Sequence, residues 1–305
     1  MKIVMYHYVR PIAGSRYPKI KGLELESFRR QLDYLMANYR IVGAEEVLEC
    51  VRTDREISEN SVWLTFDDGY KDHIKHVLPE LLQREISGTF FPPAGPSLDG
   101  QVLDVNAIHF ILAKANNEGL LLDSLERECL ESGISEEEYQ SLWTTIDKSS
   151  RYDTEGVIFF KRVLQNALPY DVRTRITKKL FREFVKIEYP AFCKELYMSL
   201  DDIQRLFQEG MTLGSHTYNH FWLNKLSISE QKIEIDRSLA FLRQIGVSDD
   251  GWIMCYPYGT YNDDTLKVLS ESGCAVGVTT EVGDATTRYK SRFTMKRFDT
   301  NDFPQ

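Results

Sequence analysis

The chain has 305 residues, 42% of them hydrophobic, and a formal net charge of −9 at pH 7. This length suits one large barrel-type domain or two ordinary domains, and the hydrophobic fraction is enough for a sizeable core. The acidic balance argues against a general nucleic-acid-binding protein, because phosphate contacts need clustered Lys and Arg. No apolar run is long enough to insert into a membrane as a helix, so we expect a soluble globular protein.

The N-terminal run of residues 1–9 is too short for a signal peptide and lacks a small-residue cleavage site. We interpret it as a first buried strand that ends near His7. The five cysteines show no paired spacing, which fits reduced thiols better than a disulfide framework. Together these features predict a cytoplasmic protein. The cysteines are Cys50, Cys129, Cys193, Cys255 and Cys274.

The next elements have clear periodicities. Residues 25–38 carry apolar positions at helical spacing, residues 40–42 read as a strand, and residues 44–51 as a second helix. Residues 61–66 form an apolar, β-branched and aromatic run that is typical of a buried strand. This run stops at Asp67, Asp68 and a glycine, and a helical pattern follows.

Two acids therefore lie where a strand ends. In a parallel α/β sheet or barrel this end carries the chemistry, because its loops are free of packing duty. Adjacent carboxylates repel each other, so Asp67 and Asp68 cost stability unless they share a cation or a proton. The alternative is a solvated loop whose acids favour the N-terminus of the following helix.

Residues 87–91 predict the next strand, which the proline-rich residues 92–96 end. From 99 to 195, charges and long aliphatic side chains alternate at helical spacing, and strand signals are few. We interpret 99–195 as a helical insertion. It is either a stabilising decoration or a cap that shapes a substrate pocket, and we favour the cap because long insertions on strand-end loops are commonly functional.

The C-terminal part alternates again between helix and strand. Ser199 is expected to cap a helix that runs to residue 209. A short apolar run at 211–213 then leads to His216 and His220, whose spacing of four would bring both imidazoles to one face of a helical turn, where they can bind one metal ion. Helices are predicted at 227–246 and 263–272, and strands at 251–256, 274–280 and 292–298. This alternation predicts a mainly parallel sheet, curled into an incomplete (β/α) barrel.

The sequence Thr-Phe-Asp-Asp-Gly at 65–69, followed far downstream by His-Thr-x-x-His at 216–220, resembles the polysaccharide deacetylase family, also called NodB-homology or carbohydrate esterase family 4 proteins. Further matching stretches are Gly-Thr-Phe-Phe at 88–91 and Tyr-Pro-Tyr-Gly at 256–259. The resemblance covers residues 1–95 and 197–280. It implies one deacetylase-like catalytic domain over 1–305, with 99–195 as the helical insertion or cap.

The resemblance also implies roles for particular residues. Asp68, His216 and His220 would be the metal ligands, and Asp67 the general base. Two imidazoles and one carboxylate leave open positions on a divalent ion, which is the arrangement of a catalytic Zn²⁺ rather than a purely structural one. The backbone N–H of Tyr258 resembles the donor that family members provide for the oxyanion.

Two departures from the family pattern affect these roles. Many relatives have an Arg two residues before the proline of the 256–259 motif, where this chain has Cys255; Arg297 or Arg292 could supply the missing charge to Asp67. No histidine follows His220 to act as a general acid. Because a branch of the family has a Tyr-His pair near its N-terminus, we expect His7 to take that role. His73, His76 and His109 lie on predicted helices, where we expect a solvated face.

The predicted function is that of a metal-dependent hydrolase that removes an N-acetyl group from an N-acetylated sugar in surface-polysaccharide biosynthesis. Without an export signal, the expected substrate is a precursor rather than finished polymer. Two alternatives stay open: a catalytically degenerate member that binds a glycan, and a hydrolase of a non-sugar amide or imide. The oligomeric state is left open. Four aromatic residues are possible sugar-stacking groups, although most such residues are core: Trp143, Tyr152, Trp222 and Trp252.

Overall fold

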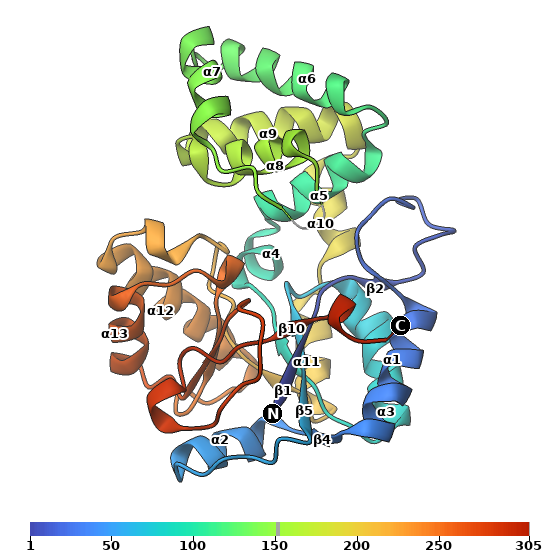
Figure 1. Ribbon diagram of the computed structural model, residues 1–305, viewed down its shortest axis with the longest axis vertical. Helices are drawn as coiled ribbons and strands as arrows, with labels where there is room; N and C mark the ends of the chain where they lie inside the picture. The colour runs from blue at the N-terminus through green and yellow to red at the C-terminus, as the bar shows by residue number, and fades with distance from the viewer. Residues whose placement is uncertain (151–152, 305) are drawn as a thin grey trace. The chain divides into compact units, whose positions relative to one another are not determined.

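Strand β5 (Ser61–Asp67) is the centre of the main sheet, and all seven of its residues are buried. In this computed structural model, which describes residues 1–150 and 153–304, β5 pairs in parallel with β1 (Lys2–Tyr6), β4 (Arg40–Val42) and β6 (Thr89–Phe91). Two shorter strands continue the sheet, β7 (Thr212–Leu213) beside β6 and β10 (Phe298–Asp299) beside β1. The resulting order is β10-β1-β5-β6-β7. Figure 1 labels β10, β1, β5 and β4 of this sheet.

The remaining strands continue the curvature of this sheet without closing it fully. Strands β8 (Ile253–Cys255) and β9 (Val276–Val278) pair in parallel with each other. Only isolated parallel bridges join them to the rest, Ser215 to Met254 on one side and Val278 to Met295 on the other. The fold is therefore an α/β fold with mostly parallel strands and an incomplete barrel, as predicted. A further parallel pair, β2 (Val9–Arg10) and β3 (Leu23–Glu24), lies outside the main sheet.

The single strand predicted for 292–298 is wrong. This segment changes partners along its length, because Met295 bridges to β9 whereas Phe298 pairs with β1. The two residues between these contacts, 296 and 297, have no strand geometry. Only Phe298 and Asp299 have strand geometry, and a 3-10 turn at Tyr289–Ser291 precedes them.

Alternation along β5 separates two apolar layers. Val62, Leu64 and Phe66 belong to the cluster that packs against the surrounding helices. Trp63 belongs to a second cluster, formed with side chains of β8, β9 and Met295 inside the incomplete barrel. Because side chains two apart on a strand share a face, Asp67 lies on the same inner face as Trp63.

Seven α-helices of this first unit lie around the sheet (Figure 1). The helix boundaries predicted at 25–38 are confirmed, and Ser199 caps its helix as predicted, accepting from the N–H of Asp202. The helical pattern after β5 begins with a π-helix, His73–Val77, before it becomes regular. The seven helices are α1 (Leu25–Asn38), α2 (Ala44–Arg52), α3 (Leu78–Gln83), α4 (Ala94–Asp99), α11 (Leu200–Gln208), α12 (Ile228–Ile245) and α13 (Asp263–Glu271).

A second compact unit is formed by residues 12–21 and 102–192. It has its own aromatic core, in which Phe110, Phe159 and Phe181 are fully buried. The short segment 12–21 belongs here because Tyr17 packs edge-on against Phe110, with ring centroids 4.6 Å apart. Its helices are α5 (Asp104–Lys114), α6 (Glu118–Glu131), α7 (Glu136–Thr145), α8 (Glu155–Arg162), α9 (Tyr170–Val185) and the first part of α10 (Tyr189–Leu196).

All five cysteines are free and buried. Among residues 1–150 and 153–304, no helix combines the length and the apolar character that crossing a bilayer requires.

Candidate active site

Polar side chains gather at the carboxyl ends of the parallel strands. They are His7 after β1, Asp67 and Asp68 at the end of β5, His216 and His220 after β7, and Tyr258 after β8. Within this group, Asp68, His216 and His220 each offer a ligand atom, and these atoms lie within 4.8 Å of one another. All three residues are buried. The structure therefore brings together the three ligands that the sequence predicted.

One carboxylate oxygen is the centre of this cluster. Oδ1 of Asp68 lies 3.3 Å from Nε2 of His216 and 3.3 Å from Nε2 of His220. It is buried, and among the described residues it has no hydrogen-bond partner. A buried carboxylate oxygen is costly to leave unpaired. Two imidazole nitrogens and one carboxylate oxygen are donors that Zn²⁺ accepts, so these three residues fit a divalent ion of that type.

Hydrogen bonding at the far side of His216 sets its orientation. Nδ1 of His216 lies 2.8 Å from the carbonyl oxygen of Cys255, and a carbonyl can only accept. Nδ1 therefore carries the proton, and Nε2 faces Asp68, which is the usual arrangement of a metal-binding histidine. Burial lowers the pKa of His216, but its neighbours Cys255 and Asp68 raise it further than burial lowers it. A proton and a metal ion would consequently compete for Nε2.

The loop that carries both histidines is not helical, so the predicted helical turn is wrong. Thr217 and His220 both have left-handed backbone angles, with φ of 60° and 59°. Glu234 on α12, which is buried, holds the loop by accepting from the backbone N–H of Tyr218 at 3.2 Å and of Asn219 at 2.8 Å. The two imidazoles converge because this loop turns back on itself, not because a helix repeats every four residues.

Asp67 is held by an arginine from the other end of the chain. Nη1 and Nη2 of Arg297 donate to the two oxygens of Asp67 at 2.9 and 2.7 Å, and both side chains are at least 98% buried. Arg297 also donates to the carbonyl oxygen of Thr279 and to Sγ of Cys255, at 2.7 and 3.2 Å. Burial raises the pKa of Asp67, but the Arg297 guanidinium holds it below its usual value.

Of the two arginines proposed for this role, only Arg297 contacts Asp67. Arg292 lies instead over the rings of Tyr289 and Phe293, at 3.8 and 4.1 Å from their centroids. The Sγ of Cys255 lies beside the guanidinium of Arg297, so Cys255 contacts the Asp67–Arg297 pair.

His7 lies beside Asp67, with Nε2 4.0 Å from Oδ2, and 39% of its side chain is exposed. The expectation that His73 faces solvent is wrong, because His73 is fully buried. Its Nε2 donates to the carbonyl oxygen of His7 at 3.0 Å, which fixes the backbone at the end of β1. Burial lowers the pKa of His73 to about 4, so this imidazole is neutral near pH 7. His73 is the first residue of the π-helix that follows β5.

Tyr258 has an unusual backbone conformation, with φ of 57°. Its ring stacks on Trp222, with centroids 4.7 Å apart, and meets the edge of the His220 ring at 4.8 Å. Asp68, Thr217 and His220 also have positive φ. Non-glycine residues in this region cost about 1–3 kcal/mol each and tend to cluster at functional sites.

Of the possible sugar-stacking aromatics, Trp222 therefore lies beside the cluster. Trp252 is core, whereas Trp143 packs against Phe159 in the second unit. Tyr152 lies outside the described residues.

Two residues at this site were not predicted from the sequence. Tyr70 is buried and donates its hydroxyl hydrogen to Oδ2 of Asp68. Burial first, and the negative charge of Asp68 second, raise its pKa well above the usual value, so it remains a neutral donor. Glu234, which holds the histidine loop, lies on a helix whose other acids are solvated. A buried polar position within the α12 pattern could have indicated it.

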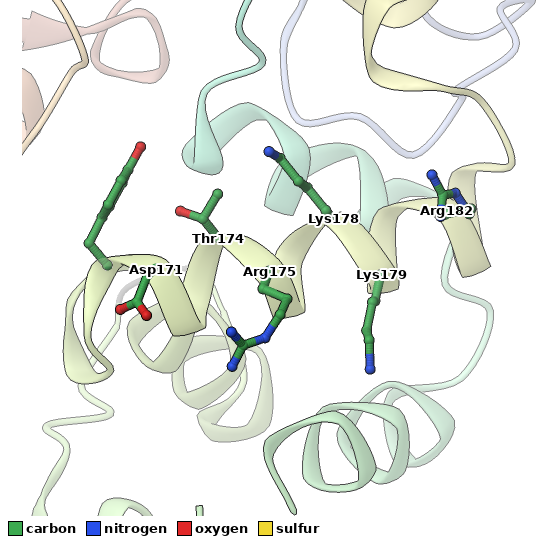
Figure 2. A pocket seen from close by; sticks show the side chains of 7 residues that line it. Asp171, Thr174, Arg175, Lys178, Lys179 and Arg182 are labelled. Carbon is green, nitrogen blue, oxygen red and sulfur yellow. The ribbon is translucent and has the colours of Figure 1, made fainter. Parts of the chain in front are cut away.

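A basic hollow runs along α9 of the second unit (Figure 2). Its cations are partly neutralised by carboxylates: Lys179 pairs with Glu128 at 2.7 Å, and Arg182 pairs with Glu188 at 2.9 Å. The acids and histidines of the candidate site all belong to the first unit. The hollow is therefore lined by none of these acids and histidines.

The fold and the site define a class: a barrel of parallel strands with a buried Asp-His-His cluster at the strand ends and a second, arginine-bound Asp beside it. Comparison with known proteins identifies this class. The profile of the family described as Polysaccharide deacetylase matches residues 54–113 and 177–277, more than half of the chain. The chain belongs to the polysaccharide deacetylase family.

Individual relatives match shorter stretches of the chain. The "Putative polysaccharide deacetylase YxkH" of Bacillus subtilis is 33% identical over 89 residues, which are 29% of this chain and 32% of that protein. A chitin deacetylase of Arthroderma benhamiae is 35% identical over 71 residues, 23% of this chain and 19% of its own length. The matches therefore span a third or less of these curated relatives.

Solved structures with the same fold cover almost the whole chain. The Streptococcus pyogenes deacetylase PplD, in complex with acetate, superposes with a TM-score of 0.59 at 18% identity, covering 98% of this chain and 91% of that one. IcaB from Ammonifex degensii gives 0.54 at 18% identity, with 97% and 90% covered. At this level of identity the likeness shows the fold alone.

Proposed function

We propose that this chain is a metal-dependent deacetylase that hydrolyses the N-acetyl group of an N-acetylated sugar, either a surface polysaccharide or its precursor. One observation carries the proposal: Oδ1 of Asp68, which has no hydrogen-bond partner among the described residues, faces Nε2 of both His216 and His220 next to the buried Asp67–Arg297 pair. Family membership supports the reaction class. All residues of the proposed site lie in the first unit, which we propose to be the catalytic domain.

We propose that Asp68, His216 and His220 hold the ion, Zn²⁺ being the one that these donors suit. Such an ion supplies a Lewis acid that polarises the acetyl carbonyl and acidifies the attacking water. Asp67 is the general base: as the water oxygen bonds to the carbonyl carbon, Asp67 accepts its proton. Because Arg297 holds both oxygens of Asp67, the base keeps its charge and its orientation in a buried setting.

The tetrahedral oxyanion needs a further donor, and we assign the backbone N–H of Tyr258. Its left-handed conformation and its ring contacts with Trp222 and His220 fix the peptide at the edge of the site. A donor of this kind typically contributes about 3 kcal/mol to lowering the barrier.

The leaving amine must be protonated, because expulsion of an amide anion is prohibitive. His7 is our general acid. It is the imidazole beside Asp67 that retains contact with solvent, so it can regain a proton after each turnover. When His7 gives its proton to the nitrogen, the C–N bond breaks and acetate and the free amino sugar are formed. Asp67 therefore takes a proton from the water, and His7 gives a proton to the leaving nitrogen.

An acetate-release assay tests this proposal. The purified chain is given Zn²⁺ and offered N-acetylglucosamine oligomers or UDP-linked N-acetyl sugars, with Asp67→Asn as the matched control. We expect metal-dependent acetate release that the Asp67→Asn variant lacks, and the substrate that is used gives its size class. Metal binding without acetate release from any sugar would favour a glycan-binding protein or a hydrolase of a non-sugar amide or imide.

A further inference from the structure

We propose that Tyr70 is a positioning residue that makes Asp68 a one-oxygen ligand and thereby strengthens the hold of the site on its metal ion. This inference rests on the proposed function. The carboxylate of Asp68 has two oxygens with different surroundings. The Tyr70 hydroxyl donates to Oδ2, whereas Oδ1 faces the two imidazole nitrogens at 3.3 Å.

The different surroundings of the two oxygens decide whether Asp68 binds a metal ion through one oxygen or through two. Because Oδ2 accepts the phenolic hydrogen, two-oxygen binding of a metal ion by Asp68 would require that hydrogen bond to weaken. A single carboxylate oxygen suits the compact tetrahedral geometry of Zn²⁺, whereas larger ions such as Ca²⁺ often take both oxygens. Hydrogen-bond partners of metal ligands typically contribute about 10–100-fold to metal affinity.

Tyr70 is itself held firmly. Its ring is fully buried and stacks on Tyr8, with centroids 4.1 Å apart and planes 22° from parallel. On the other side it faces the ring of Tyr197 at 6.3 Å, and the backbones of Tyr70 and Tyr197 form an antiparallel bridge. The next peptide adds a hydrogen bond, from the N–H of Met198 to the carbonyl of Gly69 at 3.0 Å. The phenol is therefore a fixed donor.

The backbone at Asp68 fixes the start of the side chain, but it does not fix the rotation of the carboxylate. Asp68 and Gly69 both have left-handed angles, with φ of 69° and 66°, where β5 ends and the chain turns. A Cβ on Gly69 would lie 2.9 Å from Cβ of Pro92, so only glycine fits at this point of the turn. The turn fixes where the Asp68 side chain starts, and Tyr70 fixes how its carboxylate is rotated.

Tyr70→Phe removes only the hydroxyl and keeps the stacked ring. Tyr6→Phe is the matched control, because Tyr6 is equally buried and, among the described residues, its hydroxyl has no hydrogen-bond partner. Zn²⁺ affinity of the full chain is measured by competition with a chromophoric chelator, and thermal unfolding is followed in parallel without metal. We expect a loss of Zn²⁺ affinity of about 10-fold or more in Tyr70→Phe and none in Tyr6→Phe.

The outcomes separate this inference from the proposed function. If the unchanged chain fails to bind Zn²⁺, the proposed metal site itself is refuted. If the unchanged chain binds Zn²⁺ and Tyr70→Phe binds it equally well, only the role of Tyr70 is overturned. A Tyr70→Phe chain that no longer folds would also overturn it, since the hydroxyl would then support the fold rather than the ligand.

Discussion

The pair of Arg297 and Asp67 gives the sharpest prediction about stability and activity together. Replacing Arg297 by Met removes both hydrogen bonds to Asp67 and leaves a carboxylate that is 98% buried without its counter-charge. Breaking a buried ion pair from one side costs about 3–5 kcal/mol. For a chain of this size, each kcal/mol lowers the melting temperature by about 2 °C, so we expect a decrease of about 6–10 °C.

The same variant should also lose most of its activity. Without Arg297, burial raises the pKa of Asp67, and a protonated carboxyl cannot accept the proton of water. We expect kcat to fall about 100-fold or more, measured as acetate release under conditions where the variant is folded. Arg297→Lys should recover only part of this loss, because an ammonium group cannot donate in parallel to both oxygens of Asp67.

A double variant isolates the cause. Asp67→Asn combined with Arg297→Met removes the uncompensated charge, so it should melt higher than Arg297→Met alone. Calorimetry of the two single variants and the double variant gives the coupling energy of the pair. If Arg297→Met kept the melting temperature and the kcat of the unchanged chain, the argument that this guanidinium supports Asp67 would be refuted.

Three further predictions concern other residues. His7→Asn should lower kcat about 100-fold with little change in melting temperature, because its ring is 39% exposed; lost stability with normal turnover would contradict its role as the acid. Asp104→Asn tests a carboxyl of the second unit whose side chain is 18% exposed and whose pKa is raised by burial to about 6, against the opposing charge of Arg173. Since the folded pKa lies above the unfolded value of about 3.9, the charged carboxyl destabilises the fold above pH 6, by up to about 3 kcal/mol, and this cost disappears as the pH falls towards 4. The variant should therefore be more stable at pH 7 and equally stable at pH 4, and a difference that does not depend on pH would contradict this. Glu234→Ala should cost about 2–4 kcal/mol and weaken Zn²⁺ binding, since it leaves one buried and one half-buried N–H group of the histidine loop unpaired; unchanged Zn²⁺ affinity would argue against that support.

The strand that ends in Asp67 and Asp68 could be predicted because its signal is local. An apolar run that stops at two acids shows both the strand and its functional end, and alternation then places Asp67 inside the barrel. The position of His216 at the same end of the sheet could likewise be predicted, because it follows a short strand. The way His220 reaches the same point could not, because its loop depends on Glu234 of a distant helix and on two left-handed residues.

Contacts between distant segments limited the remaining predictions. The final segment alternates like a strand, but it divides its pairing between β9 and β1, and neither partner is visible in its own sequence. No role was predicted for Tyr70, since only the folded chain shows that its hydroxyl meets Asp68. His73 was expected on a solvated helix face, whereas in the folded chain it is fully buried and bonded to the carbonyl oxygen of His7.

The central claim is that one divalent ion held by Asp68, His216 and His220 is needed for turnover. The most direct measurement titrates the metal-free chain with Zn²⁺ and follows bound metal and acetate release in the same samples, with His220→Ala as the control. We expect activity to rise in proportion to bound Zn²⁺ and to saturate at one equivalent, whereas the His220→Ala control neither binds Zn²⁺ at that site nor turns over. Full activity without bound metal, or a His220→Ala variant that remains active, would contradict it.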